Sequence, residues 1–197
     1  DIQNIATQIS KLRFFISLIC DCEKDATKPN FGIPTLPNLE TKFVTANSLI
    51  SRKNKGVEVQ LNLFIDTQIT ELKQELFQVR HDHFRAKTAN EKKKLRIKDE
   101  TLRSKLAELL TQGFTIETGA EQLAKWNPYD QNQVADFFDP EWMFNISDGF
   151  DIVIGNPPYI STKGITNADK KAYETEFGFS DDTYNLFTFK GLSLTKV

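Results

Sequence analysis

The tetrapeptide Asn156-Pro157-Pro158-Tyr159 has the residue types that could bind and activate a poorly nucleophilic amine. In an amine attached to an aromatic ring the lone pair is delocalised into the ring, and hydrogen bonds to an Asn side-chain oxygen and a backbone carbonyl favour charge developing on nitrogen. Two prolines stiffen the loop by fixing φ. Tyr159 offers a face on which a flipped-out base could stack. Asn-Pro and Pro-Pro also mark ordinary turns, and four residues alone favour a turn.

The segments ahead of the polar residues are predicted to be the strands that position them. Residues 152–154 form a continuous apolar run, as in a strand buried on both faces of a parallel sheet. Phe43 and Val44 predict a short strand ahead of Asn47. Because the strands alternate with helices, the chain is predicted to be α/β with a parallel sheet, whose ligands bind at the carboxyl ends of the strands. Asp1 lies just before the first predicted helix, where a preceding strand would end, so Asp1, Asn47 and Asn156 are expected to share one site.

Helical patterns fill most of the remaining chain. Residues 4–20 predict a well-buried helix, because apolar residues recur at three- and four-residue steps. Heptad-like spacing over residues 60–111 predicts two helices in a hairpin, joined near residues 86–92. A mixed helical pattern returns over residues 183–194. Residues 113–149 are predicted to be an irregular cover whose aromatic side chains more readily pack in a core than stack on a base, namely Trp126, Trp142 and Phe144.

Composition excludes several classes of protein. The chain has 197 residues, 39% hydrophobic and 26% charged, which suits one domain with a real core. Its net charge of −2 means that any DNA contact must come from local patches. No apolar run approaches the roughly 20 residues that span a bilayer, and no signal peptide is visible, so the predicted compartment is the cytoplasm. Cys20 and Cys22 are expected to be ordinary reduced thiols.

The stretch FDIVIGNPPYI, residues 150–160, resembles the fourth conserved motif of amino-methyltransferases that use S-adenosylmethionine. The resemblance implies that the catalytic residues are Asn156, Pro157, Pro158 and Tyr159.

Two weaker resemblances concern the cofactor. Asp1-Ile2 and the helix after it are similar to the second motif of these enzymes, whose acid binds the ribose hydroxyls of S-adenosylmethionine. Asn47-Ser48 is similar to the third motif, whose polar residue faces the cofactor adenine. Many relatives have Asp where Asn47 stands, and Asn can donate as well as accept.

Most of the chain resembles the methylase region of bifunctional type IIG restriction-modification enzymes, on the stretches LPNLETKFVTANSLI, FFDPEWMF, GFDIVIGNPPYI and DTYNLFTFKGL. This resemblance implies a partial Rossmann-like methyltransferase sheet with an inserted helical hairpin. The implied parts are a core with the second and third motifs over residues 1–59, the hairpin over residues 60–112, and a core with the NPPY motif over residues 113–197. Duplex DNA is the implied substrate, methylated on the adenine amine, and no metal is needed.

The chain is expected to be a piece of a longer polypeptide, because it starts without Met and contains no GxG. The cofactor's Gly-containing loop, later strands and a target-recognition domain are the expected missing parts. One alternative is therefore an inactive fragment that binds cofactor weakly or undetectably by itself. Another is a protein-glutamine methyltransferase acting on release factors, and an RNA adenine or guanine methyltransferase is a third. The long helical insertion favours DNA over the last two.

Smaller features have plainer interpretations. The basic run over residues 80–98 could grip phosphates, although such a run is more often a solvated face. His81 and His83 are predicted to lie on the surface, since no third metal ligand is near in sequence. The stretch Asn127-Pro128-Tyr129 is predicted to be a loop, because no apolar strand precedes it.

Overall fold

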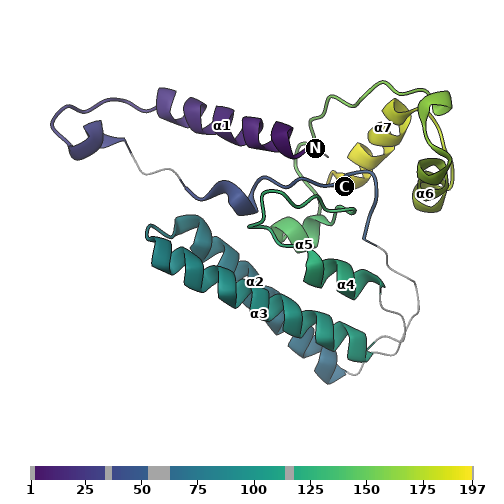
Figure 1. Ribbon diagram of the computed structural model, residues 1–197, viewed down its shortest axis with the longest axis horizontal. Helices are drawn as coiled ribbons and strands as arrows, with labels where there is room; N and C mark the ends of the chain where they lie inside the picture. The colour runs from purple at the N-terminus through teal and green to yellow at the C-terminus, as the bar shows by residue number, and fades with distance from the viewer. Residues whose placement is uncertain (1–2, 34–36, 53–62, 114–117, 197) are drawn as a thin grey trace. The chain divides into compact units, whose positions relative to one another are not determined.

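The computed structural model describes residues 3–33, 37–52, 63–113 and 118–196, and these residues are mostly helical (Figure 1). The chain divides into two compact units. Unit 1 comprises Gln3–Thr45 and Lys55–Val134, and unit 2 comprises Ala46–Asn54 and Ala135–Val197. The predicted division into core, insertion and core is based on sequence motifs, whereas these units are defined by contacts between residues, so that division stays a prediction.

A pair of long helices dominates unit 1, where the heptad-like pattern predicted two helices. Helix α2 spans Leu63–Arg85 and α3 spans Ala89–Gly113, so the joint falls at residues 86–88. The two helices lie side by side (Figure 1). Thr88 and Glu91 form a capping box at the start of α3, because each side chain accepts the other residue's backbone N–H. Four side chains of the predicted pattern form the buried seam: Leu76, Val79, Leu102 and Leu106.

Helix α1, which spans Asn4–Cys20, is less buried than its sequence predicted. Ile5, Leu12 and Ile16 remain 67%, 58% and 52% exposed. Within unit 1 the helix is held along one edge, by Phe14 against Phe43 and by hydrogen bonds to residues 131 and 132. An amphipathic pattern indicates which face of a helix can be buried, but burial also requires a neighbouring element that packs on that face.

The other elements of unit 1 are short. The 3₁₀ helices η1 and η2 span Pro29–Gly32 and Leu39–Thr41, and α4 spans Thr118–Lys125 and packs on α3. Trp126 follows α4 and is buried, as predicted.

Unit 2 contains short helices joined by extended chain: α5 (Pro140–Phe144), η3 (Thr162–Gly164), α6 (Asn167–Phe177) and α7 (Thr183–Leu194). Asp139 caps α5 by accepting the N–H of Trp142 over 2.9 Å, and Thr166 caps α6 by accepting the N–H of Asp169 over 3.1 Å. Helix α7 covers the range predicted from its pattern. Helices α4 and α5 lie in the segment that was predicted to be irregular.

The predicted strands are not formed among the described residues. Isolated parallel bridges join Ala46 to Ala135, Ser51 to Phe138 and Phe150 to Thr195. The two isoleucines of residues 152–154, which were predicted to be buried in a sheet, are 75% and 90% exposed. A strand in a parallel sheet obtains its hydrogen bonds and its cover from neighbouring strands and helices. The described residues place no strand beside this segment, so residues 152–154 have no regular secondary structure.

Candidate functional site

Helix α7 braces the segment that leads to the Asn156-Pro157-Pro158-Tyr159 motif. At the carboxyl end of the helix, the N–H of Phe150 donates to the carbonyl of Leu194 over 2.7 Å, and the N–H of Lys196 donates to the carbonyl of Phe150 over 3.0 Å. The Lys196 ammonium and the Asp151 carboxylate form an ion pair at 2.7 Å. These contacts fix where the extended segment starts.

The amino end of the same helix holds the other end of the segment. The buried Thr183 hydroxyl donates to the carbonyl of Pro158 and accepts the N–H of Ile160 over 3.0 Å. The N–H of Thr183, at the first position of α7, donates to the carbonyl of Ile160 over 3.0 Å. One of the donors that a helix start leaves unsatisfied is therefore paired by the motif loop itself.

A second contact holds the chain just beyond the motif. Both the N–H and the hydroxyl of Thr162 donate to one oxygen of Asp182, over 2.6 and 2.8 Å. These bonds stabilise the charged carboxylate and lower the pKa of Asp182 below its ordinary value. The end of the motif loop and the residues after it are thus attached to the start of α7.

The atoms that could bind an amine are left available by this arrangement. The Asn156 side chain is exposed, and neither Asn156 nor Pro157 has a hydrogen-bond partner in the part of the chain that the structure describes. The carbonyl of Pro158 is occupied by Thr183. Tyr159 is 81% exposed, and its ring lies nearly parallel to that of Tyr184, with centroids 6.3 Å apart and an interplanar angle of 11°. The loop therefore offers an amide oxygen, a free carbonyl and an open aromatic face.

The candidate cofactor residues are only partly described. Asp1 and Ile2 lie outside the described residues. Asn47 donates its N–H to the carbonyl of Ala135 over 2.9 Å, and its side-chain oxygen accepts the N–H of Leu49 over 3.2 Å.

The side-chain NH₂ of Asn47 has no partner among the residues that the structure describes, so it can still donate to an acceptor nitrogen of an adenine. Asn47 therefore fits the cofactor as a donor, and Ser48 beside it is half-buried. That Asn47 and Asn156 share one site stays a prediction.

A partly buried polar cluster fixes the segment that follows Asn47 and Ser48. The N–H of Ser51 donates to Glu176 over 3.1 Å, and the buried Lys190 ammonium contacts Ser51 Oγ over 2.7 Å and Glu176 over 3.0 Å. Burial works to raise the pKa of Glu176, but the hydrogen bonds from Ser51 and Lys190 prevail and the pKa is lowered. Lys190 belongs to α7, so this helix anchors both the segment that follows Asn47 and the motif loop.

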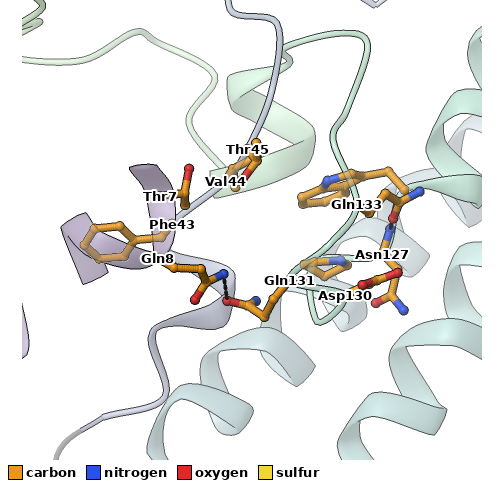
Figure 2. Close-up of a pocket in the computed structure, with 11 residues that line it drawn as sticks. Thr7, Gln8, Phe43, Val44, Thr45, Asn127, Asp130, Gln131 and Gln133 are labelled. Carbon is orange, nitrogen blue, oxygen red and sulfur yellow. Dashed lines mark hydrogen bonds between the residues drawn. The ribbon is translucent and has the colours of Figure 1, made fainter. Parts of the chain in front are cut away.

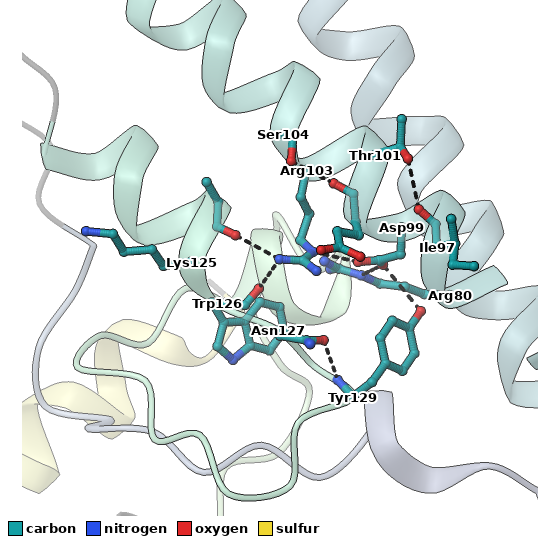
Figure 3. Close-up of polar contacts among 12 residues, drawn as sticks. Arg80, Ile97, Asp99, Thr101, Arg103, Ser104, Lys125, Trp126, Asn127 and Tyr129 are labelled. Atoms are coloured by element: carbon teal, nitrogen blue, oxygen red, sulfur yellow. Dashed lines mark hydrogen bonds and ion pairs between the residues drawn. The ribbon is translucent and has the colours of Figure 1, made fainter. Parts of the chain in front are cut away.

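Unit 1 contains a second polar cluster, centred on a carboxylate with no solvent exposure (Figure 3). Asp99 accepts from Arg80 over 2.9 Å, from Arg103 over 2.7 Å and from the Tyr129 hydroxyl over 3.3 Å. Burial lowers the pKa of Arg80 and raises that of Tyr129. Arg103 also donates to the carbonyls of residues 124 and 126, so the cluster ties α2 and α3 to the end of α4 and the chain after it.

This cluster corrects two predictions about the basic run. Arg80 was counted with a solvated or phosphate-binding face, yet it is buried as a partner of Asp99. His83 was predicted to lie on the surface, but it is fully buried and packs against the Tyr129 ring with centroids 4.6 Å apart. The reason is helical periodicity, because both side chains lie on the face of α2 that carries its buried apolar residues.

The remainder of the basic run is still open to solvent in part. Lys93 and Lys94 are exposed on α3. The predicted contact with phosphates stays a prediction for exposed residues such as these two.

A small polar pocket in unit 1 does not add to the site. It is lined by residues of α1, of the segment around Phe43 and of the loop that follows Trp126 (Figure 2). The Gln8 side chain donates to that of Gln131 over 2.9 Å. Residues 127–129 lie here in a turn, outside any helix, as predicted, with the Asn127 side chain accepting the N–H of Tyr129 over 3.0 Å. These polar groups bond to one another, so the pocket offers little to a ligand.

The sequence pattern did not predict the anchoring roles of Thr183 and Lys190. Both lie in the stretch DTYNLFTFKGL, which carried part of the resemblance. A Thr that follows an Asp at a helix start usually indicates a local cap. Only the fold brings these two residues to the motif loop and to Ser51.

An extended segment that ends in an exposed Asn-Pro-Pro-Tyr loop fits the class of methyltransferases that act on an amine nitrogen. Residues 1–197 match the family described as Eco57I restriction-modification methylase, and the chain belongs to this family of type IIG, bifunctional restriction-modification enzymes. The family is one of adenine DNA methyltransferases, which typically use S-adenosylmethionine. No curated protein and no solved structure matches the chain. No helix among the described residues is long and apolar enough to cross a membrane.

Proposed function

We propose that the protein containing this chain transfers a methyl group to the exocyclic amine of an adenine that is flipped out of a specific site in duplex DNA. The two N–H groups of the amine donate hydrogen bonds to Asn156 Oδ1 and to the carbonyl of Pro157, and Tyr159 stacks on the base. Charge developing on the amine nitrogen is stabilised by these two acceptors, which the proline-stiffened loop aims in advance. Pro158 contributes to this stiffness.

The observation that carries the proposal is the division of hydrogen-bonding atoms in the motif loop. The carbonyls of Pro158 and Ile160 are bound by Thr183. The Asn156 side chain is exposed and has no hydrogen-bond partner among the described residues, and the carbonyl of Pro157 accepts no hydrogen bond there either. Membership of a DNA methyltransferase family supports DNA as the substrate.

S-adenosylmethionine, when bound, supplies an electrophilic methyl group on its sulfonium. Asn47 would donate its side-chain NH₂ to the cofactor adenine, with Ser48 beside it, and Asp1-Ile2 would hold the ribose hydroxyls. The backbone bond from Asn47 to Ala135 keeps the Asn47 segment in place. We propose further that residues 152–154 join a Rossmann-like parallel sheet, in which their exposed side chains would become buried.

The test uses the full-length protein, radiolabelled S-adenosylmethionine, and duplex DNA and a release-factor protein as competing acceptors. We expect label in DNA, on the adenine amine. Asn156→Ala should lower kcat by about 100-fold or more, the usual effect of deleting one preorganised hydrogen-bonding group that stabilises a transition state. Asn167→Ala is the matched control, because Asn167 is exposed in the same unit and lies outside the proposed site.

Each deviation has a distinct meaning. Full turnover by Asn156→Ala would show that the role given to Asn156 is wrong. Label in the release factor alone would keep the acceptor arrangement and move the substrate to a glutamine amide, which presents a similar delocalised nitrogen.

A further inference from the structure

We infer that Thr183 is a positioning residue of the methyl transfer, because its hydroxyl fixes the backbone of the motif loop and leaves the carbonyl of Pro157 as the acceptor for the amine. This inference rests on the proposed function. It adds a residue that lies outside the motif, in the first turn of α7.

The hydroxyl and the backbone N–H of Thr183 both form hydrogen bonds with the motif loop. A hydroxyl has one hydrogen to donate and can accept in return. Thr183 donates to the carbonyl of Pro158 and accepts from the N–H of Ile160, while its own N–H donates to the carbonyl of Ile160. The backbone on both sides of Tyr159 is therefore held by one residue.

This geometry separates the two proline carbonyls of the motif. The Pro158 carbonyl is bound to Thr183, whereas the Pro157 carbonyl is not. The amine of a flipped base can therefore donate to the Pro157 carbonyl without displacing a hydrogen bond of the protein. Thr183 is buried, so water does not readily replace its hydroxyl. The adjacent contact from Thr162 to Asp182 holds the loop exit, but it does not reach the motif carbonyls.

The alternative is that Thr183 only stabilises the start of α7. A structural role of that kind would change the amount of folded protein without changing the chemistry of the folded fraction. A positioning role instead lowers kcat while leaving the KM values unchanged, because substrates still bind but the amine is aimed less well.

The experiment compares Thr183→Val with Thr183→Ser in the full-length protein, using steady-state methylation of duplex DNA. Val deletes the hydroxyl and keeps the branched shape, whereas Ser keeps the hydroxyl. We expect Thr183→Val to lower kcat, expressed per folded enzyme, by about 10- to 100-fold, with the KM values for DNA and for S-adenosylmethionine within about twofold, since small misplacements of reacting groups cost rates of this order. Thr183→Ser should stay within about threefold of the wild type.

Thr188→Val is the matched control. Thr188 lies on the same helix, is exposed, and uses its hydroxyl within the helix, on the carbonyl of Tyr184 over 2.9 Å. It should leave kcat unchanged. If Thr183→Val does not fold, Thr183→Ala against Thr183→Ser replaces it, because these two side chains differ only in the hydroxyl.

The outcomes separate this inference from the proposed function. One outcome is that the wild type methylates DNA while the hydroxyl-deleted variants keep the wild-type kcat, with or without a higher KM. Thr183 then does not position the loop. A Ser variant as slow as the Val or Ala variant would have the same meaning. If the wild type labels only the release factor, the comparison is made on that substrate. A wild type that labels neither acceptor overturns the proposed function, and this inference with it.

Discussion

The backbone N–H of Phe150 donates to the carbonyl of Leu194 over 2.7 Å, so the segment that carries the motif is tied to the carboxyl end of α7. The other end of the segment is tied to Thr183 at the amino end of the same helix. One helix thus spans the two ends of the segment. Contacts far from Asn156 along the chain should therefore affect the motif loop.

Gly149 allows this anchoring, and replacing it should break the anchor. Its φ of +88° suits glycine, and a Cβ there would lie 2.8 Å from the carbonyl carbon of Thr195 and 2.9 Å from the nitrogen of Lys196. Gly149→Ala should destabilise unit 2 by roughly 3 kcal/mol, from backbone strain together with a backbone clash. The measurement is hydrogen exchange of the α7 amides in the full-length protein.

Gly178→Ala is the control for strain alone. Gly178 has a φ of +79°, but a Cβ there would meet nothing within 4 Å. It should cost about 1 kcal/mol, the left-handed penalty without the clash. Equal effects of the two substitutions would show that the approach of Thr195 and Lys196 to Gly149 contributes nothing.

Asp99 should be essential to the packing of α2 on α3. Asp99→Asn keeps the shape but removes the negative charge with which the buried Arg80 and Arg103 both pair. Loss of one partner from a buried ion cluster typically costs about 3–5 kcal/mol. Faster hydrogen exchange along α2 and α3 in the variant is the expected result.

The exposed carboxylate Asp82 provides the comparison for Asp99. It lies on α2 with its side chain half-exposed and accepts a hydrogen bond from Gln78. Asp82→Asn should change stability by less than about 0.5 kcal/mol. An Asp99→Asn variant as stable as Asp82→Asn would refute the structural role of the cluster.

His83 should make the stability of unit 1 depend on pH. Burial lowers the pKa of His83 below its ordinary value of 6.5, and Arg96 and Lys92 add to this, against the opposite effect of Glu40 and Asp99. Below pH 6.5 the unfolded chain therefore binds a proton that the folded chain does not, so stability is present above this pH and falls as the pH falls. Hydrogen exchange of α2 between about pH 7.5 and 5.5, corrected for the intrinsic exchange rates, would measure this loss.

A variant without the imidazole tests the assignment. His83 Nε2 accepts a hydrogen bond from Arg96 Nε over 3.2 Å, which a Gln side chain can also accept. His83→Gln should reduce the loss of stability in this pH range, whereas His81→Gln, at an exposed position, should not. The same pH dependence in wild type and His83→Gln would assign the effect to another group.

Local patterns were sufficient where the cause of the structure is local. Helix α7 was predicted over its full range, and the helices α2 and α3 were predicted from their apolar spacing. This was possible because the hydrogen bonds of a helix, and the side chains that share one of its faces, join residues only three or four apart. The predicted strand at residues 152–154 depended on neighbouring strands, so its apolar run alone could not pair it. The burial of α1 and the exposure of His83 were predicted wrongly for the same reason, because both depend on which element packs against the helix.

The sequence by itself determined the Asn156-Pro157-Pro158-Tyr159 motif, the family to which it points and the helices beside it. The tertiary structure alone decided which carbonyl of the motif is occupied, because Thr183 lies 25 residues after Pro158 and meets it only through the fold. It also decided that Lys190 and Ser51, which are 139 residues apart, share a partly buried polar cluster. Hydrogen bonds and ion pairs act over a few ångströms, and only folding brings groups so distant in sequence within that range.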